Sequence, residues 1–132
     1  LSPCTHSIVA SAVGDKQKAY DLYLRTARLD LDDYNNEVAD GLHITSMAGT
    51  WLAIVQGFGG MRVKDNKLHF NPQIPEKWNA FAFNILFRSN QLNIKVEKHR
   101  TIISNIKGPA IELYLRKKLI RIESESQEEI ER

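Results

Sequence analysis

The chain has 132 residues, of which 42% are hydrophobic, and its formal net charge is +2. This balance excludes an intrinsically disordered chain, and no stretch approaches the ~18 consecutive apolar residues that a membrane span requires. The single cysteine, Cys4, excludes an internal disulfide and favours a reducing compartment. We therefore expect a cytoplasmic protein that has no membrane-bound part.

The start of the sequence gives two further expectations. It has no basic segment followed by an apolar one, so we expect no signal peptide. The first residue is Leu1 rather than Met, so we expect the chain to belong to a longer or processed polypeptide.

Charge is distributed unevenly along the chain. The first 60 residues carry a net charge of −3, and the remaining 72 residues carry +5. A basic patch of this kind can bind nucleic acid. Runs such as LRKKLIR (residues 115–121), however, alternate charged and aliphatic residues, which is typical of a solvated strand face or a protected sheet edge. We favour the second interpretation and expect no nucleic-acid partner.

Two helices are predicted at the start of the chain, over residues 5–13 and 16–31. Between them, Gly14 is a typical helix stop and Asp15 a typical N-cap, so the two helices should form an αα-hairpin. One side of the first helix is apolar and is expected to face the core: Ile8, Val9, Ala12 and Val13.

The segment DLDDYNNEVADGLH (residues 30–43) has no clean period and is rich in Asp and Asn. It is predicted to be a long irregular loop, and long ordered loops are disproportionately functional. Turn formation and solvation are the expected roles of its acidic residues: Asp32, Asp33, Glu37 and Asp40.

A third helix is predicted to start with Ser46 as its N-cap and to end near Gly57. Its sequence, MAGTWLAIVQGF (residues 47–58), is apolar nearly all round, which indicates a buried helix. Three helices are too few to bury it. Residues 1–60 are therefore expected to be the end of a larger all-helical domain.

From Met61 the pattern changes to short alternating segments separated by turn signals about every ten residues. Residues 61–125 thus predict six or seven strands arranged as a small antiparallel β-sandwich, jelly-roll-like in kind. Residues 126–132 form a polar, acidic tail that is expected to fray. The predicted fold class is α+β.

The segment GLHITSMAG (residues 41–49) carries a candidate anion site. A helix that starts here has unpaired amides and a partial positive charge, and His43, Thr45 and Ser46 add an imidazole and two hydroxyls. The simpler interpretation, in which Ser46 is only a cap and His43 only a loop residue, stays open from these residues alone. The phosphate-binding motif GxxxxGK[ST] is absent.

The other histidines, His6, His69 and His99, show no spacing typical of a metal site or a catalytic triad. The sequence therefore predicts no metal ion and no cofactor.

Residues 40–62, DGLHITSMAGTWLAIVQGFGGMR, resemble the C-terminal signature of glycoside hydrolase family 65, which contains maltose, trehalose and kojibiose phosphorylases. LRTARLDLDDYN and LHFNPQIPEKW resemble the family segments on either side. The resemblance covers nearly the whole chain. It implies the C-terminal helices of an (α/α)6 catalytic barrel over residues 1–60, followed by the β-sandwich domain.

The resemblance also implies a function. His43 and Ser46 match positions that contact inorganic phosphate in the phosphorylases, whereas Thr45 matches a variable position and Asp40 one where Glu is commoner. The full-length protein would be a glycosyltransferase-type phosphorylase. It would cleave an α-linked disaccharide with inorganic phosphate, invert the configuration at the anomeric carbon and release β-glucose 1-phosphate. Its general acid, a Glu, would lie in the upstream barrel of the same polypeptide, so this chain alone is expected to be inactive. Family members often form homodimers, but the sequence leaves open whether this protein is a homodimer.

Two alternatives remain at this point. One is a non-catalytic β-sandwich module for folding, oligomerisation or carbohydrate contact. The other is a hydrolase of the same family. Hydroxyls and an imidazole at the loop, rather than a carboxylate base, favour phosphorolysis because phosphate is already a nucleophile.

Overall fold

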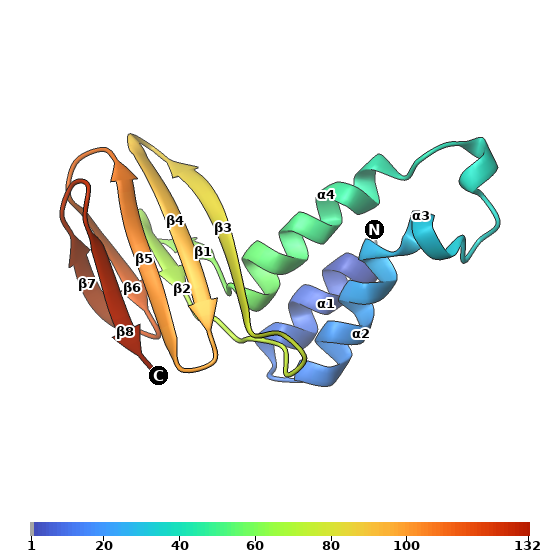
Figure 1. Cartoon of the computed structure of the whole chain (residues 1–132), viewed down its shortest axis with the longest axis horizontal. Coiled ribbons are helices and arrows are strands. Elements are labelled where there is room, and N and C mark those ends of the chain that lie inside the picture. Colours follow the sequence, from blue (N-terminus) through green and yellow to red (C-terminus); the bar gives the residue numbers. More distant parts are fainter. Residues whose placement is uncertain (1) are drawn as a thin grey trace. The chain divides into compact units, whose positions relative to one another are not determined.

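The computed structural model describes residues 2–132, and the chain divides into two compact units, one ending at Gly60 and the other beginning at Met61 (Figure 1). The first unit is helical and the second is built from two four-stranded sheets. The α+β class is therefore confirmed. Within the described residues, no helix has the length and hydropathy that a bilayer crossing requires.

The first unit opens with the predicted αα-hairpin, formed by α1 (Ser2–Ala12) and α2 (Lys16–Ala27). Gly14 ends the first helix with a φ of +83°, a conformation that costs glycine little. The carboxylate of Asp15 accepts a hydrogen bond from the Lys18 amide at 3.1 Å, as an N-cap should.

The buried face of α1 differs from the prediction, because its buried residues are small: Cys4, Ser7, Ala10 and Ser11. The larger Val9 and Val13 are 53% and 75% exposed. Close helix packing explains the difference: Ser7 Oγ donates to the Ala19 carbonyl at 2.7 Å, and Cys4 Sγ donates to the Gly49 carbonyl at 3.0 Å. Large side chains would hold these backbones apart.

The predicted irregular loop contains a single turn of helix, α3 (Leu29–Asp32), and a short 3₁₀ turn, η1 (Val38–Asp40). The next helix, α4 (Ile44–Leu52), continues directly into a π-helical segment, η2 (Ala53–Phe58).

Both ends of this helix differ from the prediction. It begins three residues earlier, with His43 rather than Ser46 as the N-cap residue. Gly57 lies inside η2, and the helical run ends when the Gly59 amide donates to the Ile54 carbonyl at 2.7 Å. The helix is also not buried all round, because three of its large apolar residues are 48–67% exposed: Ile44, Met47 and Trp51.

The second unit contains eight strands: β1 (Arg62–Lys64), β2 (Lys67–Phe70), β3 (Ala80–Phe87), β4 (Asn90–Glu97), β5 (Arg100–Lys107), β6 (Ile111–Leu115), β7 (Lys118–Ile122) and β8 (Gln127–Glu131). The sheet orders are β1-β2-β6-β7 and β3-β4-β5-β8. Pairing is antiparallel as predicted, except that β2 and β6 are parallel. Left-handed residues make two of the tight hairpin turns: Asp65, Asn66, Arg116 and Lys117.

The core of the second unit lies between its two sheets. The ring centroids of Phe70 in β2 and Phe83 in β3 are 6.3 Å apart, so side chains of the two sheets meet. Burial alternates along β4 and β5, as it should when one face of a sheet packs on a core. Fully buried aliphatic residues come from both sheets: Leu68, Leu92, Ile94, Val96, Ile103, Leu113 and Ile122.

The tail expected to fray instead forms β8, which pairs antiparallel with β5, and that expectation is wrong. The Arg100 guanidinium of β5 donates to Glu129 of β8 at 2.8 Å. Without β8, the amides and carbonyls along β5 would form an unpaired sheet edge. This acidic segment therefore forms a strand through backbone hydrogen bonds, although it has no hydrophobic pattern.

Candidate functional site

The three predicted phosphate ligands lie at the start of α4. His43 is the N-cap residue, and Thr45 and Ser46 are the second and third residues of the helix. The His43 side chain is 29% exposed and Thr45 is exposed, whereas Ser46 is only 6% exposed. Ser46 shares one helix face with the buried Gly49, so the three candidate residues differ in their access to a ligand.

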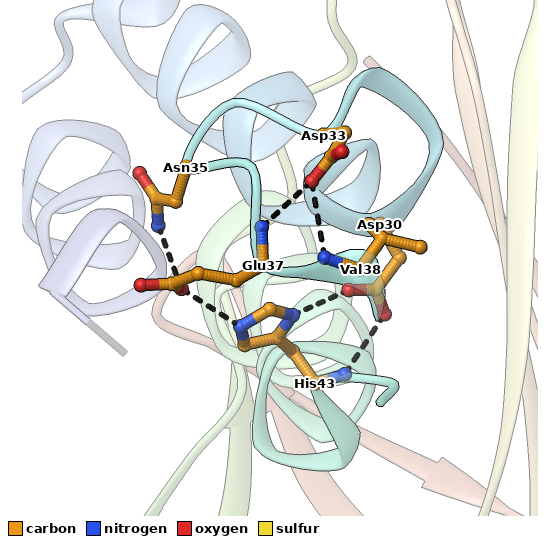
Figure 2. A network of polar contacts seen from close by, with 6 residues as sticks. All are labelled: Asp30, Asp33, Asn35, Glu37, Val38 and His43. Atoms are coloured by element: carbon orange, nitrogen blue, oxygen red, sulfur yellow. Dashed lines mark hydrogen bonds and ion pairs between the residues drawn. The ribbon is translucent and has the colours of Figure 1, made fainter. Parts of the chain in front are cut away.

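His43 is held by Asp30, which belongs to α3 (Figure 2). Asp30 Oδ1 lies 2.5 Å from His43 Nδ1, and Oδ2 accepts a hydrogen bond from the His43 backbone amide at 3.0 Å. One carboxylate therefore ties the ring to its own backbone. Because the Asp30 side chain is only 14% exposed, this contact fixes the ring orientation and leaves Nε2 on the opposite side.

A second carboxylate faces the other ring nitrogen. Glu37 Oε2 lies 3.4 Å from His43 Nε2, and the same oxygen lies 3.4 Å from Asn35 Nδ2 (Figure 2). Both distances exceed the ~2.9 Å of an optimal N–H···O bond. The Glu37 side chain is 53% exposed, so this contact is far looser than the one with Asp30.

The loop that brings these groups together reverses direction through three residues with positive φ: Asp33, Asn36 and Gly41. Asp and Asn tolerate this conformation better than other non-glycine residues. Asp33 Oδ1 accepts hydrogen bonds from the amides of Glu37 and Val38 at 3.0 and 3.1 Å. The turn-forming role predicted for Asp33 is thus confirmed, and it places Glu37 beside His43.

The contact between Asp30 and His43 changes the pKa of both residues. The hydrogen bond from His43 lowers the pKa of Asp30, and the hydrogen bond to Asp30 raises the pKa of His43, with a smaller contribution from Glu37. His43 is therefore held toward the imidazolium form, in which Nδ1–H donates to Asp30 and Nε2–H is also a donor. This ring is the kind of donor that an anion needs.

Two residues of this site were missed by the sequence analysis: Asp30 and Asn35. Asp30 lies 13 residues before His43, and no local spacing rule joins positions that far apart. The available signal was the DLDD run at residues 30–33, which was assigned to turns. Glu37 was assigned to solvation, whereas its carboxylate contacts the ring. Within residues 2–132, no group of His, Cys, Asp and Glu is placed to hold a metal ion.

Comparisons with known proteins cover both units. A family model described as "Glycosyl hydrolase family 65 central catalytic domain" matches residues 1–52, and one described as "Glycosyl hydrolase family 65, C-terminal domain" matches residues 61–122. The chain is 47% identical to an α,α-trehalose phosphorylase of Thermoanaerobacter brockii over 93% of its own length and 16% of that protein. It is also 47% identical to a maltose phosphorylase of Bacillus subtilis (strain 168) over 86% of its length and 15% of that protein.

A solved structure described as a candidate kojibiose phosphorylase from the human microbiome superposes with a TM-score of 0.90 at 37% identity. It covers 98% of this chain, which in turn covers 19% of that structure. The chain thus spans about one sixth of the length of the curated relatives it matches.

Proposed function

Because the chain belongs to glycosyl hydrolase family 65, we propose that it is the C-terminal part of a glycoside phosphorylase that cleaves an α-linked disaccharide with inorganic phosphate. The predicted family resemblance is confirmed. The observation that carries the activity is the 47% identity to proteins named as trehalose and maltose phosphorylases, which extends through the His43 loop and into the sandwich.

In this reaction a phosphate oxygen attacks the anomeric carbon of the sugar from the side opposite the glycosidic oxygen. The bond between the anomeric carbon and that oxygen breaks with inversion, and the leaving oxygen takes a proton from a general acid. The products are β-glucose 1-phosphate and the released sugar. No residue of this chain is assigned as the acid; we expect a Glu of the upstream barrel of the same polypeptide.

The start of α4 would hold the phosphate in line for attack. His43, kept toward the imidazolium form by Asp30, offers an Nε2–H donor with positive charge. The first amides of α4 and the helix dipole favour an anion at the same place. The hydroxyls of Ser46 and Thr45 are the further proposed donors. Orientation of a nucleophile in this way contributes to the rate because the reacting atoms are already aligned.

The remaining partners are proposed on the same basis. The upstream barrel would cover the large apolar residues that the helical unit exposes, such as Ile44, Met47 and Trp51. We propose a homodimer in the cytoplasm. The enzyme would need no cofactor, and inorganic phosphate would be its co-substrate.

The test uses the full-length protein with maltose, trehalose and kojibiose, each with and without inorganic phosphate, and measures release of glucose 1-phosphate. We expect phosphate-dependent release with one of these sugars, and loss of it in the double variant His43→Ala/Ser46→Ala with its circular dichroism spectrum retained. His99→Ala is the matched control, because this exposed histidine lies in the other unit.

Each other outcome identifies an alternative. Release of free glucose without phosphate would indicate a family hydrolase. Absence of turnover in the wild-type protein would favour a non-catalytic module. Unchanged phosphorolysis in the double variant would remove His43 and Ser46 from the phosphate site.

A further inference from the structure

One oxygen in the His43 network occupies an unusual position. Glu37 Oε2 lies 3.4 Å from two separate donors, His43 Nε2 and Asn35 Nδ2. Both donors face an anionic oxygen that comes from a half-exposed side chain on a loop. The two contacts are long, so the carboxylate is attracted to this position without being well fitted to it.

Asp30 is bound quite differently. Its two oxygens make a short contact to the ring and a second bond to the backbone of the same residue, and its side chain is mostly buried. Asp30 therefore cannot leave without releasing His43, whereas Glu37 can swing into water and lose only two weak contacts. The ring has one permanent carboxylate partner and one exchangeable partner.

We propose that Asp30 is the positioning residue of the phosphate site, and that Glu37 is an internal anion that phosphate displaces from the donors His43 Nε2 and Asn35 Nδ2. This inference rests on the proposed function and extends it in two ways. It adds Asn35 as a fourth donor side chain to phosphate, and it assigns to Glu37 the role of a competing ligand.

Phosphate is the stronger ligand for this position for two reasons. Its charge near neutral pH is larger than that of a carboxylate, so its bond to the imidazolium gains more electrostatic energy. It also presents several oxygens, which can reach Asn35, His43 and the first amides of α4 together. Glu37, once released, regains its hydration at the surface, so its displacement costs little.

The experiment measures the kcat of the full-length enzyme and its KM for inorganic phosphate at a fixed saturating disaccharide concentration. Glu37→Gln keeps the shape of the side chain but removes its charge, so we expect the phosphate KM to fall several-fold at nearly unchanged kcat. The matched control is Glu128→Gln, an exposed carboxylate of β8 that should leave both parameters unchanged.

Asp30→Asn should act in the opposite direction. Loss of the charged partner lets the ring turn and lose its proton, and we expect the phosphate KM to rise about tenfold or more, as for loss of a charge-assisted hydrogen bond. Asn35→Ala should raise the phosphate KM by a smaller factor. Asp32→Asn is the matched control for Asp30→Asn, since Asp32 pairs with Arg28 instead of His43.

A pH profile separates positioning from a merely structural role. The charged groups that face His43 are Asp30 from α3 and Glu37 from the following loop, and both raise its pKa. Asp30→Asn should therefore move the alkaline limb of kcat/KM for phosphate to lower pH, whereas Asn35→Ala should leave that limb in place. Phosphate's own titration is common to all variants and cancels in this comparison.

Failure of this inference is distinguishable from failure of the proposed function. If His43→Ala abolishes phosphorolysis but Glu37→Gln leaves the phosphate KM unchanged or raises it, the displacement is wrong while the function stands. If Asp30→Asn loses its fold, which circular dichroism would reveal, the exposed Glu37 and Asn35 variants still decide the outcome. If the wild-type enzyme shows no phosphate dependence, the proposed function itself is wrong.

Discussion

The two units of this chain differ in the size of most of the residues that they bury. In the sandwich, the fully buried side chains are large, and Leu92, Ile94 and Leu113 all have 0% exposure. In the helical unit, the buried positions are mostly small, such as Ser7 and Ala19, while Val13 and Leu31 are 75% and 77% exposed. The sandwich thus completes its own hydrophobic core, whereas the helical unit is held by close backbone packing and by polar contacts.

This difference has a consequence for the candidate site, which lies in the helical unit. Its geometry depends on the Asp30–His43 pair and on the Asp33 turn rather than on a hydrophobic core. Such contacts respond to charge and pH, whereas burial of aliphatic residues does not. Four predictions test the comparison, and each unit contains one tryptophan as a reporter, Trp51 in the helical unit and Trp78 in the sandwich.

The largest effect is expected from truncation of a core residue of the sandwich. Leu113→Ala should lower the free energy of unfolding by about 2–5 kcal/mol, since it leaves a cavity at a fully buried position. Val9→Ala in α1 should change it by less than about 0.5 kcal/mol, because Val9 is 53% exposed. Urea denaturation of Trp51→Phe and Trp78→Phe backgrounds measures each unit separately. Equal losses in the two units would contradict the comparison.

The second prediction compares two glycines with positive φ. At Gly108 (φ +117°) an added Cβ would lie 2.3 Å from the Ser89 carbonyl oxygen, whereas at Gly14 (φ +83°) nothing lies within 4 Å. Gly14→Ala should cost about 1–2 kcal/mol from backbone strain alone. Gly108→Ala should cost more, because the strand ends must also separate. Thermal melts of the two variants provide the measurement, and a smaller loss for Gly108→Ala would contradict the prediction.

A smaller effect is expected at the cap of α2. Asp15→Ala removes the acceptor of the Lys18 amide and should cost about 1 kcal/mol in the helical unit. Asp21→Ala on the same helix removes only an exposed contact with Gln17 and should cost less than about 0.5 kcal/mol. The signal of Trp51 should report the loss and that of Trp78 should not, so a change reported by both would show that the units unfold together.

The smallest effect is a pH dependence that differs between the units. Asp30, whose pKa is lowered, stabilises the fold above its unfolded value, and this contribution is lost as the pH falls through the folded value. His43, whose pKa is raised, stabilises the fold below its unfolded value, and this contribution is lost as the pH rises through the folded value. The Asp30–His43 pair therefore contributes most to the free energy of unfolding between about pH 4 and pH 6.5.

In the sandwich, Arg100 and Lys95 lower the pKa of Glu97 to about 2, so this residue stays ionised throughout that range and above it. Raising the pH from 6 to 9 should thus lower the melting temperature reported by Trp51 more than that reported by Trp78. Asp30→Asn should abolish the part of this slope that comes from the His43 pair. An unchanged slope in that variant would assign the pH dependence to other groups.

Much of the fold was predictable because its signals are local. Alternation and regularly spaced turn signals in residues 61–125 predicted a series of short strands. Asp65 and Asn66 make one hairpin turn with residue types that tolerate a positive φ, whereas Arg116 and Lys117 make another without that preference. The Gly14-Asp15 corner was equally readable. The buried face of α1 was not predictable in this way. Helical periodicity identifies the face with large apolar residues, whereas close helix packing buries the face with small residues.

The candidate site was likewise predictable only in part. The motif at residues 41–49 identified His43, Thr45 and Ser46 as candidates, since a helix start with an imidazole and hydroxyls is a local pattern. The sequence by itself therefore determined most of the strands, the positions of several turns and three candidate residues for an anion site. Only the tertiary structure decided that β2 runs parallel to β6, that the acidic tail closes the edge of β5, and that Asp30 returns to His43 across 13 residues. Each of these pairings joins segments that are far apart in the sequence. They form because the whole fold must bury apolar side chains and pair its backbone amides and carbonyls, and no single segment shows this requirement.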